Sequence, residues 1–219
     1  MSTPPPLRIA ITGGIAEGKS TVLRMVAARG YAVASADEAA RGAFRDDETN
    51  DALARIIGAE PPITGAELAA ALARAAEAGD DRLRRRVNAV MHPAVRARMD
   101  ASRMEERRLS FDEVPLLLEA CLQGRYDEVW VVACSPETKA ARLDERYGPA
   151  GERPGGFAAI ADAQLPGPVR RAFADRVILT DGSLSETEAQ VAAALAALEK
   201  RQGEILGERW TSEARGAGE

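Results

Sequence analysis

A glycine-rich segment with the chemistry to bind phosphate runs from Gly13 to Ser20 and reads Gly-Gly-Ile-Ala-Glu-Gly-Lys-Ser. It matches the pattern G-x-x-x-x-G-K-[ST] at every fixed position. Gly13 and Gly18 allow backbone conformations that are closed to other residues, so successive N–H groups can point toward a polyphosphate. Lys19 would reach the β- and γ-phosphates of ATP, and the Ser20 hydroxyl would bind Mg²⁺. The predicted ATP-binding residues of this segment are Gly14, Ile15, Ala16, Glu17, Gly18, Lys19, Ser20 and Thr21.

Such a loop needs a strand before it and a helix after it, and the flanking residues predict both. Residues 7–12 have the β-branched content of a buried strand, and residues 19–29 carry apolar side chains at helical spacing. Strands and helices continue to alternate along the chain. This order predicts an α/β fold of the P-loop NTPase class, with a five-stranded parallel sheet, helices on both faces, and ligands beyond the carboxyl ends of the strands. The other strands are expected at 31–35, from 109 onward, at 128–134 and at 176–180.

Residues 1–200 are expected to form one domain with a helical insertion. The insertion, at 49–107, is Ala-rich and helical in pattern, and we expect it to be a substrate domain. Breaks are expected at Glu60-Pro61-Pro62 and Gly79-Asp80, and His92-Pro93 is expected to interrupt a long basic stretch. The core of the domain is expected at 7–48, 108–145 and 172–200.

The segment 146–171 is rich in Gly and Pro, a composition that suits a mobile lid. Arg142 and Arg146 lie one helical turn apart where this lid begins, and their guanidinium groups could neutralise charge on a phosphoryl group in transfer. We assign Arg142 to ATP binding and Arg146 to catalysis; the alternative for both is a solvated basic face. The polar, Gly-rich residues 201–219 are expected to be a disordered tail.

Composition indicates an ordinary globular enzyme domain. The chain has 219 residues, of which 46% are hydrophobic, enough to bury a substantial core. Its net charge of −5 argues against a nucleic-acid partner, and no apolar run is long enough to suggest a membrane span or a signal peptide. Cys121 and Cys134 have neither metal-ligand spacing nor a disulfide framework. We expect a cytoplasmic protein that is a monomer or a weak oligomer.

Several separated motifs resemble those of the dephospho-CoA kinases. The stretch Thr12–Thr21 follows the family's Thr-Gly-Gly-Ile-x-x-Gly-Lys-Ser-Thr, and Ala36–Arg41 follows its Ala-Asp-x-x-Ala-Arg. His92-Pro93 matches the family's His-Pro. Val114–Glu119 is similar to Val-Pro-Leu-Leu-Phe-Glu, and Ala174–Ile178 to Ala-Asp-x-Val-Ile. The order and spacing of these motifs extend the resemblance over residues 7–200.

The resemblance implies that ATP phosphorylates the ribose 3′-hydroxyl of dephospho-CoA, with Mg²⁺ as cofactor, in the last step of coenzyme A synthesis. It implies Asp37 as the general base for that hydroxyl; the alternative is a carboxylate that caps a helix. Arg41 would position the substrate or form an ion pair with Asp37. The predicted catalytic residues are Lys19, Asp37 and Arg146, and the predicted substrate-binding residues are Asp37, Arg41, His92, Glu113 and Leu116.

Three of these substrate residues have two interpretations. His92, the only histidine, would contact substrate or pack locally, and packing is the favoured interpretation. Glu113, or Asp112 beside it, would lie at the sheet edge, where Glu113 would hold a magnesium-bound water or orient the substrate. The segment Leu116–Leu118 would be either core or an apolar wall for the pantetheine arm.

The chain departs from the family pattern at several positions. Ala16 stands where the family usually has Gly, Ser35 where it has an acid, and Glu113 where Asp is common. Ile160 lies where the lid usually carries an Arg-Ile-x-x-Gln pattern, and Thr180 stands where Asn is common. These changes could alter the contacts with adenine, the electrostatics of the lid and the catalytic rate. Two alternatives therefore stay open: another P-loop kinase of a nucleoside or nucleotide, and a nucleotide-binding regulator that has lost turnover.

Overall fold

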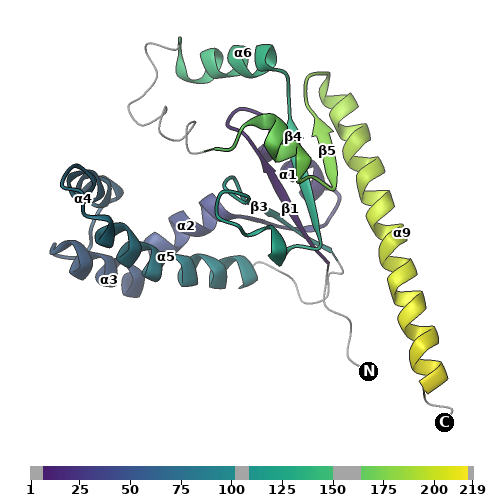
Figure 1. Ribbon diagram of the computed structural model, residues 1–219, viewed down its shortest axis with the longest axis horizontal. Helices are drawn as coiled ribbons and strands as arrows, with labels where there is room; N and C mark the ends of the chain where they lie inside the picture. Colours follow the sequence, from purple (N-terminus) through teal and green to yellow (C-terminus); the bar gives the residue numbers. More distant parts are fainter. Residues whose placement is uncertain (1–6, 102–108, 150–163, 217–219) are drawn as a thin grey trace. The chain divides into compact units, whose positions relative to one another are not determined.

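The computed structural model describes residues 7–101, 109–149 and 164–216, with side chains up to residue 202 (Figure 1). The chain forms two compact units. The first consists of Met1–Val33 with Glu106–Glu219, and the second of Ala34–Glu105. The second unit therefore begins before residue 49, where the sequence places the start of the helical insertion, because the helix that follows β2 groups with the other helices of this unit.

A five-stranded sheet organises the first unit. Its order is β2-β3-β1-β4-β5, so the strand that precedes the phosphate-binding loop lies at the centre. The pairs β1–β3, β1–β4 and β4–β5 are parallel, with Ile11 opposite Glu113 and Trp130. The predicted five-stranded parallel sheet is confirmed. The strands are β1 (Leu7–Gly13), β2 (Ala32–Ser35), β3 (Leu109–Glu113), β4 (Glu128–Ala133) and β5 (Arg176–Leu179).

Two helices of the first unit begin at residues with clear start signals, and the first of them begins at Lys19, as the sequence predicts. The side chain of Ser135 accepts a hydrogen bond from the N–H of Thr138, and Pro136 follows at the first helical position, as expected for a helix start. Gly18 precedes the helix after the loop in a left-handed conformation. The helices are α1 (Lys19–Ala28), the 3₁₀ turn η1 (Gln123–Arg125), α6 (Pro136–Tyr147), α8 (Gly167–Ala172) and α9 (Leu184–Gly216).

Apolar side chains on alternate strand positions bury the sheet on both faces. Phe111 and Trp130 stack edge to face at 5.3 Å, and their face is covered by α1 and α9. Val129 and Val131, which alternate with Trp130 along β4, are buried as well. The core of the first face comprises Ile9, Ile11, Val22, Val26, Leu109, Phe111, Trp130, Val132, Ile178, Val191, Ala194, Leu195 and Leu198.

Helix α9 extends further than the sequence indicates. It continues through residues 201–216, which we expected to be a disordered tail. Each residue added to an existing helix gains a backbone hydrogen bond without a new nucleation cost, and most residues after Lys200 are tolerated in a helix. The composition rule for disorder therefore underestimates how far the helix propagates.

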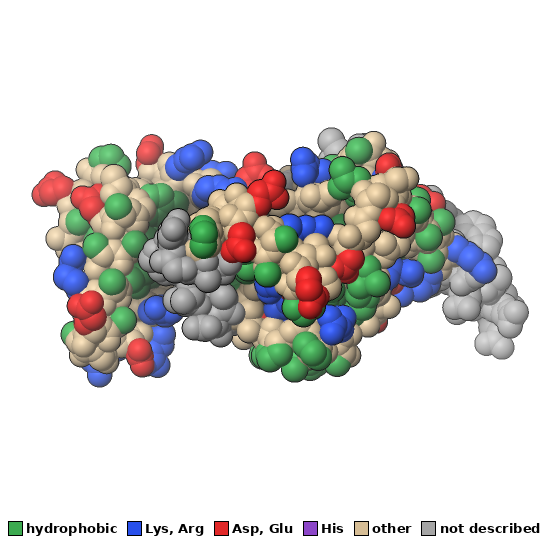
Figure 2. Space-filling view, turned by 90° about the horizontal axis from the view of Figure 1, so that it is seen from above, with side chains coloured by type: hydrophobic (Ala, Val, Ile, Leu, Met, Phe, Trp, Pro, Cys, Tyr) green, Lys and Arg blue, Asp and Glu red, His purple; other side chains and the backbone are tan. Residues whose placement is uncertain are grey.

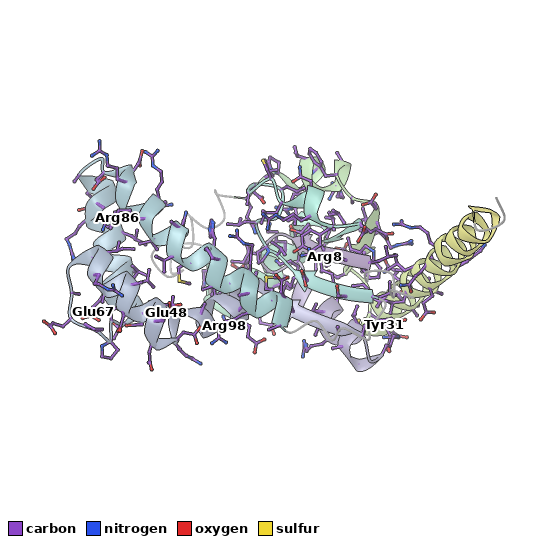
Figure 3. The ribbon with its side chains drawn as sticks, turned by 90° about the horizontal axis from the view of Figure 1, so that it is seen from below. Arg8, Tyr31, Glu48, Glu67, Arg86 and Arg98 are labelled. Atoms are coloured by element: carbon purple, nitrogen blue, oxygen red, sulfur yellow. The ribbon has the colours of Figure 1, made fainter. Side chains whose placement is uncertain are left out.

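Four helices form the second unit: α2 (Ala36–Phe44), α3 (Asp47–Ile57), α4 (Gly65–Glu77) and α5 (Asp81–Ala101). Its small core comprises Leu53, Ala54, Ile63 and Val87. Asn50 fixes the connection before α4, because its amide accepts from the N–H of Ile63 at 2.8 Å and donates to the Ile63 carbonyl at 3.0 Å. On the outside of this unit, Arg98 of α5 pairs with Asp46 (Figure 3).

The expected breaks near Pro61-Pro62 and Gly79 are confirmed, but the one at His92-Pro93 is wrong. Helix α5 runs through Pro93 without ending. Val87, Val90 and Met91 before the proline pack on the core of the unit, and Met99 after it is buried as well. Burial on both sides of Pro93 offsets the hydrogen bond that proline removes.

The outer surface carries mixed charge. On the face shown in Figure 2, Lys and Arg side chains are interspersed with Asp and Glu side chains. The outer edge of β5 is covered locally by Gln190, whose amide accepts from the N–H of Leu179 and donates to its carbonyl, both at 2.9 Å. Among the described residues, none of the helices combines the length and apolar composition needed to cross a bilayer.

Candidate functional site

The loop between β1 and α1 has the backbone conformation of an anion cradle. Gly18 is left-handed, with φ of 93°. At Gly13 a Cβ would lie 2.4 Å from the carbonyl oxygen of Val132, so only glycine fits there. Ala16 is also left-handed, with φ of 61°. A side chain makes this conformation costly, so the departure from glycine at Ala16 places strain in the loop.

The two reactive side chains of the motif lie at the start of α1. Lys19 is buried, and its ammonium group donates to the carbonyl of Gly14 at 2.8 Å, so it reaches back across the loop. The hydroxyl of Ser20 donates to Oε1 of Glu113 at 3.3 Å. Both side chains therefore face the carboxyl ends of β1 and β3, as the fold class requires. Thr21 follows on α1, where its hydroxyl accepts from Arg24 at 3.2 Å.

The register of β3 decides between its two acidic residues. Glu113 reaches Ser20, whereas Asp112, on the opposite face of the strand, accepts from the Tyr126 hydroxyl at 3.0 Å. Arg8, labelled in Figure 3, lies 3.8 Å from the same Asp112 carboxylate. Asp112 is thus part of a buried structural cluster, and Glu113 is the acid that the structure brings to the loop.

Arg142 lies against the phosphate-binding loop. Its guanidinium donates to the carbonyl of Ala16 at 3.4 Å and to the carbonyl and hydroxyl of Thr180 at 2.5 and 2.9 Å. The Thr180 hydroxyl in turn donates to the carbonyl of Glu17 at 3.0 Å. Arg146, one turn later, is exposed and stacks over the ring of Tyr147 at 5.4 Å. Of the two arginines, the structure brings Arg142 to the loop, and the catalytic role of Arg146 stays a prediction.

Glu17 turns its side chain into the protein and is 5% exposed. Its carboxylate accepts from the N–H of Gly14 at 2.5 Å and from Arg170 at 2.8 and 3.0 Å, and Lys139 lies 3.1 Å away. Sequence reasoning missed Arg170 and Lys139. An acid at a variable position of a phosphate-binding loop was the available signal, because such an acid needs a cation when it is buried.

The end of the lid segment also reaches the loop. Gln164 accepts from the N–H of Ile15 at 3.0 Å, and the N–H of Leu165 donates to Glu119 at 2.7 Å. Residues 150–163 of the expected lid, which include Ile160, lie outside the described residues. Beside the loop, the N–H of Ser135 donates to Asp181 at 2.7 Å and holds the pKa of that carboxyl below its usual range. Burial raises the pKa of the nearby Cys134 thiol.

Asp37 and Arg41 lie in the second unit, on α2. Asp37 is exposed in the first turn, but the N-cap is Ser35, whose hydroxyl accepts from the N–H of Glu38 at 3.4 Å. The alternative role of Asp37 as the helix cap is therefore wrong. Arg41 is exposed, and among the described residues it has no ion-pair partner, so the alternative of a pair with Asp37 is also wrong.

His92 and Leu116 also present exposed side chains. His92 lies on α5 and is exposed, which contradicts the favoured interpretation that it packs locally. Pro93 does not turn His92 inward, because the helix continues through the proline. The face of the helix that packs on the core carries Val87 and Met91. Leu116 is 42% exposed, whereas Leu117 and Leu118 are buried. Leu117 and Leu118 are therefore core residues, which was one of the two interpretations of this segment, and Leu116 is available to a ligand.

The oxygen atoms near Ser20 suit a magnesium ion that arrives with a nucleotide. The Ser20 hydroxyl and the Glu113 carboxylate are already 3.3 Å apart. Mg²⁺ prefers oxygen ligands and takes only one or two from the protein when phosphates and water supply the rest. Within the described ranges no cluster of three or more His, Cys, Asp or Glu side chains could hold a metal by itself. The residues present fit an ion carried by a polyphosphate.

Comparisons with known proteins agree with this geometry. Residues 7–186 match the family model described as dephospho-CoA kinase. A dephospho-CoA kinase of Geobacter metallireducens is 38% identical over 195 residues, covering 85% of this chain and 94% of the relative, and one of Gloeobacter violaceus is 39% identical over 191 residues, covering 85% and 90%.

Solved structures show the same fold. The crystal structure of TT1252 from Thermus thermophilus superposes with a TM-score of 0.73 at 33% identity, covering 89% of this chain and 98% of that one. A dephospho-CoA kinase from Campylobacter jejuni, at 21% identity, gives a TM-score of 0.62 over 88% and 97% and supports the fold. With the family model matched over most of its length, the chain belongs to the dephospho-CoA kinase family.

Proposed function

We propose that this protein transfers the γ-phosphoryl group of ATP to the 3′-hydroxyl of dephospho-CoA and so forms coenzyme A. The observation that carries the proposal is the loop after β1. Its left-handed Gly18, its buried Lys19 and the contact of Ser20 with Glu113 form the constellation that phosphoryl transfer uses. Membership of the family supplies the acceptor.

In the proposed reaction a bond forms between the 3′-oxygen and the γ-phosphorus, while the bond from that phosphorus to the β,γ-bridging oxygen breaks. ADP leaves, and the hydroxyl proton passes to the carboxylate of Asp37. Ser35 already caps α2, so the Asp37 carboxylate is not needed for the helix start. General-base assistance of this kind contributes about 10²- to 10⁴-fold.

Charge on the transferring group would be neutralised from the loop side. Lys19 would exchange its bond to the Gly14 carbonyl for phosphate oxygens, and Arg142 lies beside the same loop. Arg146 would join them when the lid closes. Mg²⁺, when bound with ATP, would lower the charge on the β- and γ-phosphates, and Ser20 with Glu113 would hold it.

Arg41, His92, Glu113 and Leu116 are the proposed substrate contacts. The exposed cation Arg41 suits the anionic pyrophosphate of dephospho-CoA, and the exposed apolar face of Leu116 suits its pantetheine arm. The proposal also places the enzyme in the cytoplasm as a monomer or weak oligomer with no nucleic-acid partner. Two free cysteines support that location.

The test is an acceptor panel. The purified protein is incubated with MgATP and dephospho-CoA, adenosine, AMP or other acceptors, and products are identified by mass. Coenzyme A formed from dephospho-CoA alone is the expected result. Preferred phosphorylation of a nucleoside or nucleotide would replace the proposal with another small-molecule kinase. ATP binding without any product would instead indicate a regulator.

A further inference from the structure

Glu17 makes a buried link between the phosphate-binding loop and helix α8, which lies at the end of the expected lid segment (146–171). Its carboxylate binds the N–H of Gly14 within the loop and Nη2 of Arg170 on α8. Both side chains are almost fully buried, Glu17 at 6% and Arg170 at 3% exposed. The residues lie 153 positions apart, so no local pattern predicts the contact.

The surrounding atoms leave Arg170 dependent on Glu17. Its Nη1 donates to the carbonyl of Leu165 at 2.7 Å, and its Nε has no hydrogen-bond partner within the described residues. Glu17 is thus the carboxylate that balances this buried cation. Removing one member of a buried ion pair leaves an uncompensated charge, which costs far more than the pair itself contributes.

Gly14 shows that the loop is built around this pair. A Cβ at Gly14 would lie 2.3 Å from Oε1 of Glu17 and 2.7 Å from Nη2 of Arg170. Any side chain there would therefore displace the carboxylate and the guanidinium. The glycine at this position serves close packing against the ion pair, because its backbone is not among those with positive φ.

A second contact joins the same two segments. Gln164, which lies shortly before α8, accepts from the N–H of Ile15, the residue after Gly14. The N–H groups of two consecutive loop residues therefore donate to the side chains of Glu17 and Gln164. Glu17 in turn binds Arg170, so both contacts connect the loop to residues 164–170. This double attachment ties the position of residues 164–170 to the conformation of the loop.

We propose that Glu17 and Arg170 are positioning residues that set the conformation of the phosphate-binding loop for nucleotide and couple it to residues 164–170. They act through the Gly14 and Ile15 backbone and touch no reacting atom. The inference rests on the proposed function only in requiring that the loop bind a nucleotide. Loss of the pair then weakens nucleotide binding, while the acceptor site is unaffected.

The test is a double-mutant cycle of Glu17→Gln, Arg170→Gln and the two together, with ADP affinity measured by isothermal titration calorimetry in the presence of Mg²⁺. Each single variant is expected to bind ADP at least about fivefold more weakly, and the double variant no more weakly than the worse single one, since paired residues are not additive. Glu137→Gln and Arg171→Gln, both exposed and outside the pair, are matched controls that should bind ADP normally.

Arg170→Lys separates positioning from general packing. It keeps the cation and should recover most of the ADP affinity, and KM for ATP should rise in the glutamine variants while KM for dephospho-CoA stays unchanged. Circular dichroism and Tm confirm that each variant is folded; if a single variant does not fold, the lysine and double variants still complete the comparison. Additive losses, or normal ADP affinity in folded Glu17→Gln, would overturn the proposal.

The ADP measurement uses no acceptor. If wild-type protein binds ADP but does not phosphorylate dephospho-CoA, the proposed function is wrong and the cycle still decides the role of the pair. If wild-type protein does not bind ADP, both proposals are wrong.

Discussion

The guanidinium of Arg142 donates to both oxygen atoms of Thr180, to the carbonyl at 2.5 Å and to the hydroxyl at 2.9 Å. The same hydroxyl donates to the carbonyl of Glu17, so Thr180 connects the arginine to the loop. The threonine that departs from the family pattern is thus the residue that holds Arg142 in place.

Thr180→Val should therefore loosen Arg142 without changing the volume of the side chain. Losing hydrogen bonds worth about 0.5–1.5 kcal/mol each should raise KM for ATP by roughly three- to tenfold, with little change in KM for dephospho-CoA. Steady-state kinetics with each substrate varied in turn measures the effect. Thr180→Ser, which keeps the hydroxyl, is the control, and equal loss in both variants would contradict the role of the hydroxyl.

Ala16→Gly should relieve strain in the loop. The left-handed conformation costs an alanine about 1–2 kcal/mol, and glycine loses about 0.5–1 kcal/mol in folding entropy, so a net gain of up to about 1.5 kcal/mol is expected. Urea unfolding measures the difference. The matched change Ala70→Gly, at an exposed position within α4, should instead destabilise by about 1 kcal/mol. A destabilised Ala16→Gly would show that the conformation is not strained.

Lys19→Ala should abolish phosphoryl transfer and leave the fold intact. The lysine charge is expected to act on the phosphates, and its ammonium group donates to the carbonyl of Gly14 within the loop. Product formation is followed by mass detection and folding by circular dichroism. A folded variant with near-normal turnover would eliminate the loop chemistry.

Asp37→Asn should lower kcat at least about a hundredfold with little change in ATP affinity, because it removes the proposed base. Ser35→Ala is the control on the same helix. It removes the N-cap and should cost about 1 kcal/mol of stability while turnover is largely retained. A kcat of Asp37→Asn similar to that of the wild type would show that Asp37 is not the general base.

Tyr31 should make stability fall at alkaline pH. Burial, followed by a hydrogen bond to Glu199, raises the pKa of Tyr31 to about 12 from its ordinary value of about 10. The unfolded chain releases this proton first, so the contribution is fully present below about pH 10 and is lost as the pH rises toward 12. Urea unfolding of wild type and Tyr31→Phe across this range should show the steeper decline in wild type. If the stability of wild type and of Tyr31→Phe fell equally with pH, groups other than Tyr31 would be responsible.

Much of the fold follows from local patterns in the sequence. The strand before Gly13 and the helix after Gly18 were both predicted, because β-branched content and helical spacing are short-range properties. Two local predictions were wrong. The helix continues through Pro93 and past Lys200, where packing in one case and propagation in the other outweigh composition.

The sequence by itself determined the phosphate-binding loop, the order of strands and helices, and the motifs that the family shares. Only the tertiary structure decided which side chains meet across elements. Strand register separates Glu113 from Asp112, and the pairs Arg142–Thr180 and Glu17–Arg170 join residues far apart in the chain. Backbone hydrogen bonding and periodicity are encoded within a few residues, whereas a buried charge takes its partner from whichever element the fold packs beside it.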